Sequence, residues 1–235
     1  MVMDNSIIIT GGNRGLGFYL IKIFLEKGFK VYAIIRHSSN ELEELKKCFK
    51  NSLYLFNADI KDYEAVKKAV KEIANITPNV DILINNAAIH VENPPPKIEE
   101  IDLSVYENTF KNNALAPLNL IRYSVSLVKK SKKKLIVNIS SEAGSIGACW
   151  REAEFAYCMS KAALNMMSKI LQNRYGKEGI KVLAIHPGWF SSDMGGVDAP
   201  ITPEEAAFNV SNIILKNWKT DDPVFVDTTG KEMAW

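Results

Sequence analysis

Cysteine and histidine are scarce in this chain. Its 235 residues include three cysteines and three histidines, namely Cys48, Cys149, Cys158, His37, His90 and His186. An odd number of cysteines without metal-ligand spacing favours free thiols in a reducing cytoplasm over a disulfide framework. The histidines stand singly, so they predict no zinc site. We therefore expect a cytoplasmic protein without a bound metal.

The chain also lacks a strong excess of charge and any long hydrophobic run. Its formal net charge is +2, from 29 basic and 27 acidic side chains that are interspersed. No global field therefore favours nucleic acid or a membrane surface as a partner. No stretch has the length needed to span a bilayer, and the first residues lack the basic and hydrophobic regions of a secretory signal. We expect neither nucleic acid nor a membrane as a partner.

Short hydrophobic runs alternate regularly with longer helical patterns. Strands are predicted at 7–9, 30–35, 53–57, 81–85, 135–140, 181–186 and 223–226, and helices at 16–27, 40–49, 63–74, 103–128 and 155–175. This alternation predicts an α/β fold, a Rossmann-type doubly wound parallel sheet with helices on both faces. The length fits one domain, 1–235. Its binding site is expected at the carboxyl ends of the strands.

A glycine-rich turn, TGGNRGLG at 10–17, follows the first predicted strand. Without side chains, Gly11, Gly15 and Gly17 let the backbone turn sharply and approach a pyrophosphate closely. The amides and the dipole at the start of the next helix attract such an anion. The turn therefore predicts a dinucleotide site.

Tyr157 and Lys161 lie four residues apart in a predicted helix, and hence on the same face. An unperturbed tyrosine ionises near pH 10, so proton transfer at neutral pH needs a shift of about three units, or about 4 kcal/mol. A lysine cation at about 4 Å, in an effective dielectric of about 20, supplies about that much. We therefore expect Lys161 to lower the pKa of Tyr157.

These motifs, together with Asn113, Ser141 and the turn at 187–188, make nearly the whole chain resemble the short-chain dehydrogenase/reductase family. The segment 193–196 and the final Trp235 resemble its carbonyl-reductase-like, C-factor-like branch. The resemblance implies an oxidoreductase that reduces an aldehyde or ketone, or oxidises the alcohol, with a nicotinamide cofactor, and the brief segment at 191–202 favours a small or loosely held carbonyl compound. It also implies a homodimer or homotetramer that pairs through the helices at 103–128 and 155–175.

The predicted cofactor contacts follow the first, second, third, fourth and sixth strands, and two more lie in the helix at 155–175. The predicted set is Gly11, Asn13, Arg14, Gly15, Leu16, Gly17, Arg36, Asp59, Ile60, Asn86, Ala87, Tyr157, Lys161, Pro187, Gly188, Phe190 and Ser192. Asp59 matches the family's adenine contact, but it also suits an N-cap of the helix that follows. Ala88 replaces a glycine of the family motif, and Ser192 replaces a threonine while keeping a hydroxyl.

The residue after the second strand bears on the choice of cofactor. An acidic residue there would hold the ribose hydroxyls and repel an added phosphate, but this chain has Arg36. Arg14 is a second guanidinium that can bind a phosphate in bidentate fashion. We expect NADP(H) rather than NAD(H). In the alternative interpretation, Arg36 is only a solvated strand end. His37 either joins the pocket for the 2′-phosphate or lies at the surface.

The resemblance assigns catalysis to Asn113, Ser141, Tyr157 and Lys161. Ser141 is expected to donate a hydrogen bond to the carbonyl oxygen, with Ser140 as the rival because only one of two neighbours on a strand points into the cleft. Asn113 matches the asparagine whose backbone holds a water that links Lys161 to solvent. Asn112, one residue away, is the alternative.

The loop between Ser141 and Tyr157 is longer than is usual in the family. We expect it to shape the substrate pocket. Trp150 and Arg151 are candidates to contact substrate there, and the alternative is that the aromatic side chain staples the loop to the body. Neither Cys149 nor Cys158 has a histidine partner close by in the sequence, so neither is predicted to be a nucleophile.

The predicted reaction transfers a hydride from the nicotinamide to the carbonyl carbon. Ser141 positions the oxygen, Tyr157 protonates it, and Lys161 with the Asn113 water restores that proton. The rival hypothesis is a non-catalytic NADP(H)-binding redox sensor or signalling protein, which has no need for Tyr157 and Lys161 together. An epimerase or dehydratase of nucleotide sugars is disfavoured by the glycine spacing and by the short C-terminal part.

Overall fold

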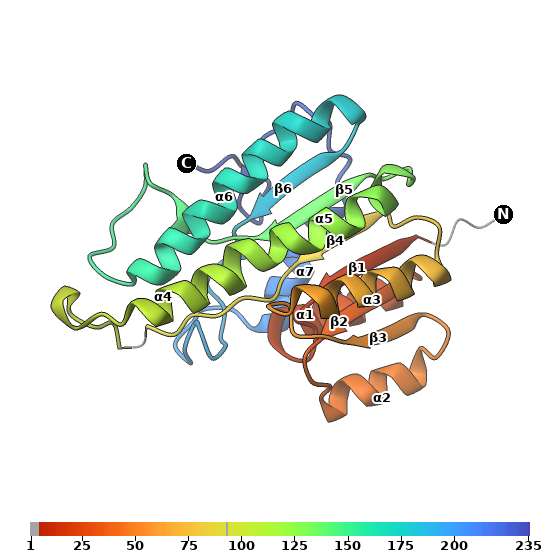
Figure 1. The fold of residues 1–235 in the computed structure, drawn as a ribbon, viewed down its shortest axis with the longest axis horizontal. Coiled ribbons are helices and arrows are strands. Elements are labelled where there is room, and N and C mark those ends of the chain that lie inside the picture. The colour runs from red at the N-terminus through yellow and green to blue at the C-terminus, as the bar shows by residue number, and fades with distance from the viewer. Residues whose placement is uncertain (1–4, 93) are drawn as a thin grey trace.

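The computed structural model describes residues 5–92 and 94–235. At its centre lies a seven-stranded sheet in the order β3-β2-β1-β4-β5-β6-β7, and all neighbouring strands pair in parallel (Figure 1). The strands are β1 (Ser6–Thr10), β2 (Lys30–Ile35), β3 (Leu53–Asn57), β4 (Ile82–Asn85), β5 (Leu135–Ile139), β6 (Lys181–Ile185) and β7 (Phe225–Val226). The predicted Rossmann-type parallel sheet is confirmed.

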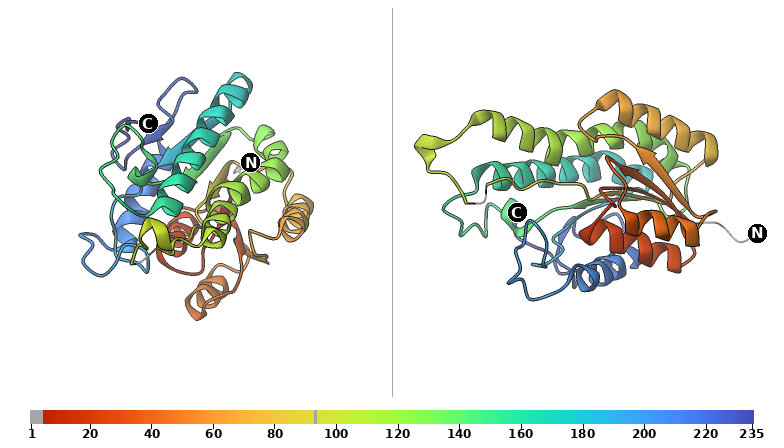
Figure 2. Two further views of the ribbon diagram at one scale, coloured as in Figure 1. Left: turned by 60° about the vertical axis from the view of Figure 1, so that its left-hand side comes forward. Right: turned by 90° about the horizontal axis from the view of Figure 1, so that it is seen from below.

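Helices cover both faces of this sheet (Figure 2). One face carries α1 (Gly15–Glu26), α2 (Asn40–Cys48) and α7 (Pro203–Leu215). The other carries α3 (Tyr63–Ile76), α4 (Leu103–Phe110), α5 (Ala116–Lys129) and α6 (Phe155–Tyr175). The short elements are the 3₁₀ helices η1 (Ile98–Glu100), η3 (Glu142–Gly144) and η4 (Gly176–Glu178) and the π-helical turn η2 (Lys111–Leu115). None of the helices in the described residues is long and apolar enough to cross a membrane.

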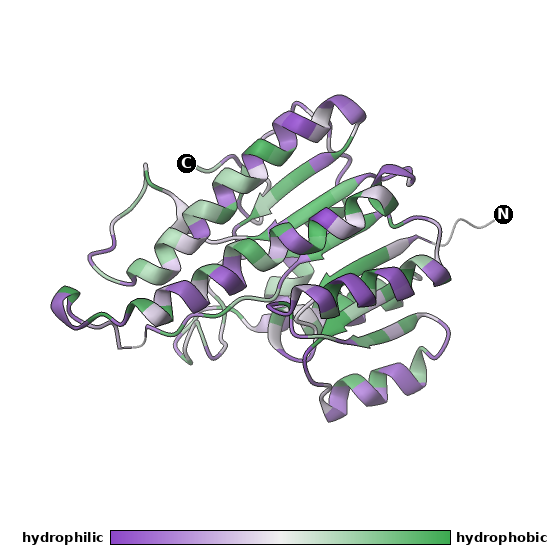
Figure 3. Ribbon diagram, viewed as in Figure 1, coloured by the Kyte–Doolittle hydropathy of each residue, from purple (hydrophilic) through white to green (hydrophobic). Residues whose placement is uncertain are grey.

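The sheet separates two hydrophobic clusters. Ile7 and Ile9 of β1 pack with Phe24 of α1 in one cluster, whereas Ile8 packs with Val70 of α3 in the other. Successive side chains of a strand point to opposite faces, so a sheet covered on both faces needs hydrophobic residues at every position. Figure 3 accordingly shows strands that are largely hydrophobic, while the helices alternate between hydrophobic and hydrophilic stretches.

Three elements differ from the sequence prediction. The patterns considered above do not predict α7, which begins in a capping box between Thr202 and Glu205. The helix expected at 103–128 is interrupted by η2, because one wider turn separates α4 from α5. The strand expected at 223–226 is limited to β7, which pairs with β6 over only two positions.

The sheet order also positions the site. β1 lies between β2 and β4, so the chain changes direction across the sheet at this point. In open α/β sheets, ligands bind in the crevice beyond the carboxyl ends of the strands at such a switch point. The glycine turn at 10–17 and the segments after β4, β5 and β6 all begin at this edge.

Candidate active site

The glycine turn is packed too tightly on one side for a side chain. A Cβ on Gly17 would lie 2.1 Å from the carbonyl oxygen of Gly11. A Cβ on Gly11, whose φ is +72°, would lie 2.7 Å from the Cα of Ala87. Gly15, at φ +55°, instead has open space where a Cβ would point. The turn therefore presses against the protein at Gly11 and Gly17 and is open at Gly15.

The segment after β4 holds this turn in place. The Asn86 Nδ2 donates to the carbonyl oxygens of Thr10 and Gly11 at 3.0 and 2.8 Å. The backbone amides of Asn86 and Ala87 donate to the Thr10 hydroxyl, each at 3.2 Å. Each bond ties the end of β4 to the end of β1, so the predicted cofactor residues of the two strands form one unit.

The start of α1 is suited to an anion. Its N-cap residue, Arg14, makes no side-chain capping bond, and the first turn contains no acidic residue. The first amides of a helix have no partner within the helix, and the helix dipole adds positive character there. An open backbone at Gly15 beside these amides fits the pyrophosphate of a dinucleotide.

The two arginines expected at a phosphate lie in different surroundings. Arg14 forms an ion pair with Asp193, in the segment after β6. Arg36 is exposed just beyond β2. The contact of Arg14 thus joins the glycine turn to the segment expected beside the nicotinamide.

Asp59 closes a turn of its own. Its Oδ1 accepts from the backbone amide of Lys61 at 2.9 Å. The N-cap of α3 is Asp62, whose carboxylate accepts from the amides of Glu64 and Ala65. The alternative interpretation of Asp59 as this N-cap is therefore wrong, because the helix starts at Tyr63, too far along for Asp59 to reach its first free amides.

The segment after β6 turns back over the same edge. Gly188 has a φ of +84°, which lets the chain reverse there, and Phe190 packs against the hydrophobic cluster. The Ser192 hydroxyl oxygen accepts from the amide of Gly195 at 2.9 Å. The Ser192 hydroxyl hydrogen is not used in that bond.

Ser140 and Ser141 have separate roles. The Ser140 hydroxyl donates to the side chain of Asn165 at 2.6 Å, inside the protein. The Ser141 hydroxyl donates to Glu142 Oε2 at 2.5 Å and accepts from the amide of Ala143 at 3.2 Å, and it lies close enough to Tyr157 to influence the pKa of the phenol. The structure thus places Ser141, and not Ser140, beside Tyr157.

The Lys161 Nζ lies 5.6 Å from the centroid of the Tyr157 ring. Its side chain is buried, and the Nζ donates to the carbonyl oxygen of Ile139 at 2.9 Å. Burial raises the pKa of Tyr157 to about 12 and lowers the pKa of Lys161 to about 8. The expected lowering of the Tyr157 pKa is therefore wrong for the polypeptide, because burial disfavours both charged forms.

Asn113 lies in η2 and connects two parts of the site. Its side chain accepts from the amide of Ile89 at 2.9 Å and donates to the carbonyl oxygen of Ile89 at 2.8 Å. The same amide group donates to the Ser160 hydroxyl at 3.1 Å. Asn113 therefore ties α6 to the segment after β4. A π-helical turn at such a place is typical of functional sites.

Several polar residues beside Tyr157 were not predicted. Glu92, which is 3% exposed, accepts from the backbone amide of Tyr157 at 2.9 Å and from the Tyr106 hydroxyl at 3.2 Å. It replaces the local cap of α6, since the N-cap residue Glu154 has a left-handed φ of +62° and makes no capping bond. Glu92 is 65 residues away along the chain, so no local spacing marks it.

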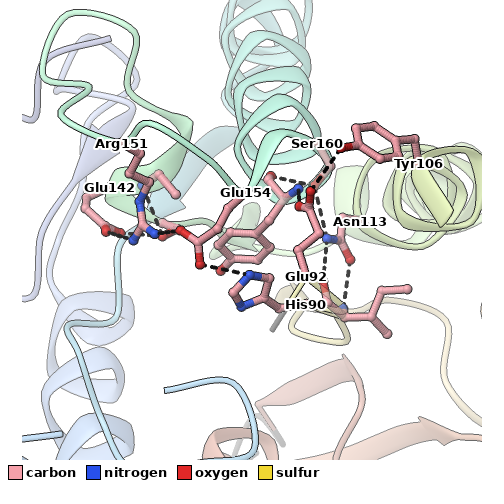
Figure 4. Close-up of polar contacts among 12 residues, drawn as sticks. His90, Glu92, Tyr106, Asn113, Glu142, Arg151, Glu154 and Ser160 are labelled. Atoms are coloured by element: carbon pink, nitrogen blue, oxygen red, sulfur yellow. Dashed lines mark hydrogen bonds and ion pairs between the residues drawn. The ribbon is translucent and has the colours of Figure 1, made fainter. Parts of the chain in front are cut away.

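The long loop is anchored by charge. Arg151 pairs with Glu142 at 2.5 Å and with Glu154, and Glu154 also lies 3.1 Å from the ring of His90 (Figure 4). The His90 ring centroid is 4.5 Å from that of Tyr157. Arg151 thus holds the loop to the body by ion pairs, a role that the sequence suggested only for an aromatic side chain. Trp150 is 74% exposed, so it does not anchor the loop in a core.

Metal-binding arrangements are absent from the described part of the chain. No group of three or more His, Cys, Asp or Glu within residues 5–92 and 94–235 is arranged to hold an ion. All three cysteines are free thiols. Cys158 is half-buried, and burial raises the pKa of its thiol, which makes it a poor nucleophile.

Comparisons with known proteins agree with this geometry. A family model described as short chain dehydrogenase matches residues 5–200. An uncharacterised oxidoreductase of Saccharomyces cerevisiae is 35% identical over 253 aligned positions, covering 97% of this chain and 96% of that protein. The solved structure of the carbonyl reductase Sniffer of D. melanogaster has a TM-score of 0.93 at 29% identity, covering 98% of this chain and 99% of the other.

A second solved structure is NADPH-bound carbonyl reductase from chicken fatty liver, with a TM-score of 0.88, 29% identity and the same coverage of both chains. The family model spans well over half of the chain, and these relatives span nearly all of it. The chain therefore belongs to the short-chain dehydrogenase family of oxidoreductases, in its carbonyl-reductase-like branch.

Proposed function

We propose that this chain reduces an aldehyde or ketone to an alcohol with NADPH, and catalyses the reverse oxidation with the same residues. The observation that carries the proposal is the meeting of Tyr157, Ser141 and Lys161 at the carboxyl end of β5, beside the glycine turn. Hydroxyl, phenol and buried ammonium are the groups needed to position a carbonyl oxygen, protonate it and stabilise the charge that develops on it.

Each residue has one role in this reaction. A pKa of about 12 keeps Tyr157 protonated at neutral pH, so that it can donate its proton to the carbonyl oxygen. Ser141 hydrogen-bonds that oxygen. Lys161, with a pKa of about 8, is mainly cationic at neutral pH and favours the phenolate left after proton transfer. Asn113 holds the segment after β4 against α6.

NADPH, when bound, supplies the hydride. The residues that would hold it are those of the glycine turn, with Arg14 and Arg36 at the 2′-phosphate, Asp59 and Ile60 at the adenine, and Asn86 and Ala87 behind the ribose. Pro187, Gly188, Phe190 and Ser192 would lie at the nicotinamide end. The NADPH-bound chicken reductase supports this choice of cofactor.

Exposed apolar side chains favour an apolar carbonyl compound as substrate. Ile146 and Trp150 of the long loop are 81% and 74% exposed, and Trp189 after β6 is 57% exposed. Both segments follow strands whose carboxyl ends form the edge with the active site. Apolar surface of this kind is typical of ligand-binding regions.

The decisive test is turnover on a panel of aldehydes and ketones. We expect NADPH consumption, followed at 340 nm, with one alcohol formed for each NADPH oxidised. A redox sensor would bind NADPH tightly and oxidise it with none of the compounds. That result, obtained with protein shown to be folded, would refute the reductase proposal and favour the redox-sensor hypothesis.

Replacing Arg36 with Asp is expected to reverse the cofactor preference. The exposed guanidinium would be lost from the 2′-phosphate, and the carboxylate would repel the phosphate while accepting hydrogen bonds from the ribose hydroxyls of NADH. We expect the KM for NADPH to rise by at least about tenfold, the equivalent of about 1.4 kcal/mol. Steady-state kinetics with both cofactors measures this. An unchanged KM for NADPH would mean that Arg36 is only a solvated strand end.

We also propose a cytoplasmic homodimer or homotetramer built from one-domain subunits, 1–235. Apolar side chains of η2, α5 and α6 remain exposed in the single chain, namely Leu115, Leu118, Met159, Met166 and Ile170. Pairing through these helices would bury them. Sedimentation equilibrium should therefore give a mass that is a multiple of the 26.3 kDa subunit. A mass equal to one subunit would refute the pairing.

A further inference from the structure

Glu92 is a buried acid to which the reaction described above gives no role. It is 3% exposed and lies in the segment after β4. Its Oε2 accepts from the backbone amide of Tyr157 at 2.9 Å, and its Oε1 accepts from the Tyr106 hydroxyl at 3.2 Å (Figure 4). A buried carboxylate without partners is costly. These two donors, one of them on the proposed proton donor itself, therefore fix where the oxygens of Glu92 lie.

The bond to Tyr157 replaces a cap that α6 lacks. The first amides of a helix have no partner within the helix, and the side chain of the N-cap residue usually accepts from one of them. Here the N-cap residue Glu154 has a φ of +62°, and its side chain makes no capping bond. Glu92 accepts from the Tyr157 amide instead, and the dipole of α6 favours an anion at this end. The next amide, that of Cys158, already donates to the Glu154 carbonyl oxygen at 3.0 Å, as in a regular helix.

The segment that carries Glu92 also contacts the glycine turn and the Tyr157 ring. At its start, Asn86 Nδ2 donates to the carbonyl oxygen of Gly11 at 2.8 Å. Further along, the His90 ring centroid lies 4.5 Å from that of Tyr157. The segment 86–92 therefore holds the turn expected at the pyrophosphate at one end and the proposed proton donor at the other.

The middle of this segment is tied to the same helix. Asn113 accepts from the amide of Ile89 at 2.9 Å and donates to its carbonyl oxygen at 2.8 Å. Asn113 also donates to the Ser160 hydroxyl at 3.1 Å, and that hydroxyl donates to the carbonyl oxygen of Tyr157 at 2.8 Å. The backbone of Tyr157 is thus held through its amide by Glu92 and through its carbonyl oxygen by Ser160.

We propose that Glu92 is a positioning residue for Tyr157, which holds the first turn of α6, and with it the phenol, at a fixed place relative to the glycine turn. This inference rests on the proposed function. Transfer of a hydride and a proton needs the reacting groups in one geometry, and a misplacement of about 1 Å can lower the rate by about 10²-fold. Glu92 acts through the backbone of Tyr157 and not on the reacting atoms.

The test substitution is Glu92→Leu, which removes the acceptor oxygens and fills the buried site with an apolar side chain. The Tyr157 amide then loses its partner, and the first turn of α6 loosens. We expect the single-turnover rate of NADPH consumption, followed at 340 nm, to fall by about 10²-fold. The Kd for NADPH should change by less than about threefold, because the glycine turn is untouched. The substrate is the compound of the aldehyde and ketone panel that the unmodified chain reduces fastest.

Glu92→Gln separates the acceptor oxygen from the charge. The side-chain oxygen of glutamine can accept from the Tyr157 amide, and its NH₂ group can donate to the Tyr106 hydroxyl oxygen. We therefore expect this variant to keep most of the single-turnover rate. A loss as large as that of Glu92→Leu would overturn the proposal, because the charge of Glu92, and not its capping bond, would then be what the reaction needs.

Asp62→Leu is the matched control, since it removes the carboxylate that caps a different helix. Asp62 Oδ1 accepts from the amides of Glu64 and Ala65 at 3.1 and 3.0 Å, and α3 carries none of the proposed reacting groups. Both leucine variants should have a lower Tm than the unmodified chain, because each helix loses a cap. Only Glu92→Leu should react slowly at a temperature at which every variant is folded. An equal loss of rate in Asp62→Leu would overturn the proposal in favour of a general loss of stability.

Hydrogen exchange tests the positioning step without turnover. The amides of 155–158, followed by mass spectrometry, should exchange faster in Glu92→Leu than in the unmodified chain or in Glu92→Gln. In Asp62→Leu the faster exchange should instead lie at the start of α3. Unchanged exchange at 155–158 in Glu92→Leu, or an unchanged single-turnover rate, overturns the proposal. If Tyr157→Phe kept full turnover, the proposed function itself would fail instead.

Discussion

Tyr157→Phe is expected to lower kcat for carbonyl reduction by about 10³-fold, because the substitution removes the only hydrogen that the ring can donate to the substrate oxygen. General acid catalysis contributes about 10² to 10⁴ in rate. The rest of the site is untouched, so NADPH binding should be nearly unchanged.

The measurement combines kcat from NADPH consumption with NADPH affinity from fluorescence. Tyr54→Phe is the control, since it makes the same chemical change in β3, where the hydroxyl only donates to the carbonyl oxygen of Asn51. The control should keep its activity. Full turnover by the Tyr157→Phe protein, with cofactor bound, would refute the assignment of Tyr157 as the proton donor.

Gly17→Ala is expected to abolish NADPH binding and to reduce the free energy of unfolding by about 3 kcal/mol, at the upper end of the usual cost of overpacking. The added methyl group would lie 2.1 Å from the oxygen of Gly11 and 2.5 Å from Asn86 Nδ2. Neither can move without opening the turn that Asn86 holds. The backbone that would face the pyrophosphate is then displaced.

Gly12→Ala is the control for Gly17→Ala, because it also adds one methyl group to the glycine turn. Its Cβ would lie 2.2 Å from the Cδ1 of Ile21, the far end of a flexible side chain that can rotate away. We expect a cost of about 1 kcal/mol and retained binding. Urea unfolding and NADPH titration compare the two variants. Equal behaviour of both would show that the close contact between Gly17 and Gly11 is not what shapes the turn.

The sheet was predictable because its strands are hydrophobic on both faces and are separated by helical stretches. The start of α7 carried a signal too, since Thr202 and Glu205 have the spacing of a capping box and Pro203 suits the first helical turn. The π-helical turn η2 carried none. It depends on how Asn113 bonds Ile89 and Ser160, which are distant in the sequence.

Candidate site residues that belong to short motifs could also be located from the sequence. Tyr157 and Lys161 are one helical turn apart, so their spacing alone places them together. Glu92 and Arg151 reach the site from separate loops, and no local pattern marks them. The direction of the Tyr157 pKa was also beyond the sequence, because it depends on burial, which the spacing of two residues does not specify.

By itself, the sequence determined the order of the strands along the chain and most of the helices between them, where the chain turns at glycine, and which phenol and ammonium share a face of α6. These features follow from periodicity and from interactions between near neighbours. Only the tertiary structure decided which serine meets Tyr157, which acid caps α6, and that Glu142 and Arg151 complete the site. Those contacts join residues brought together by packing, whose burial and charge set the behaviour of Tyr157.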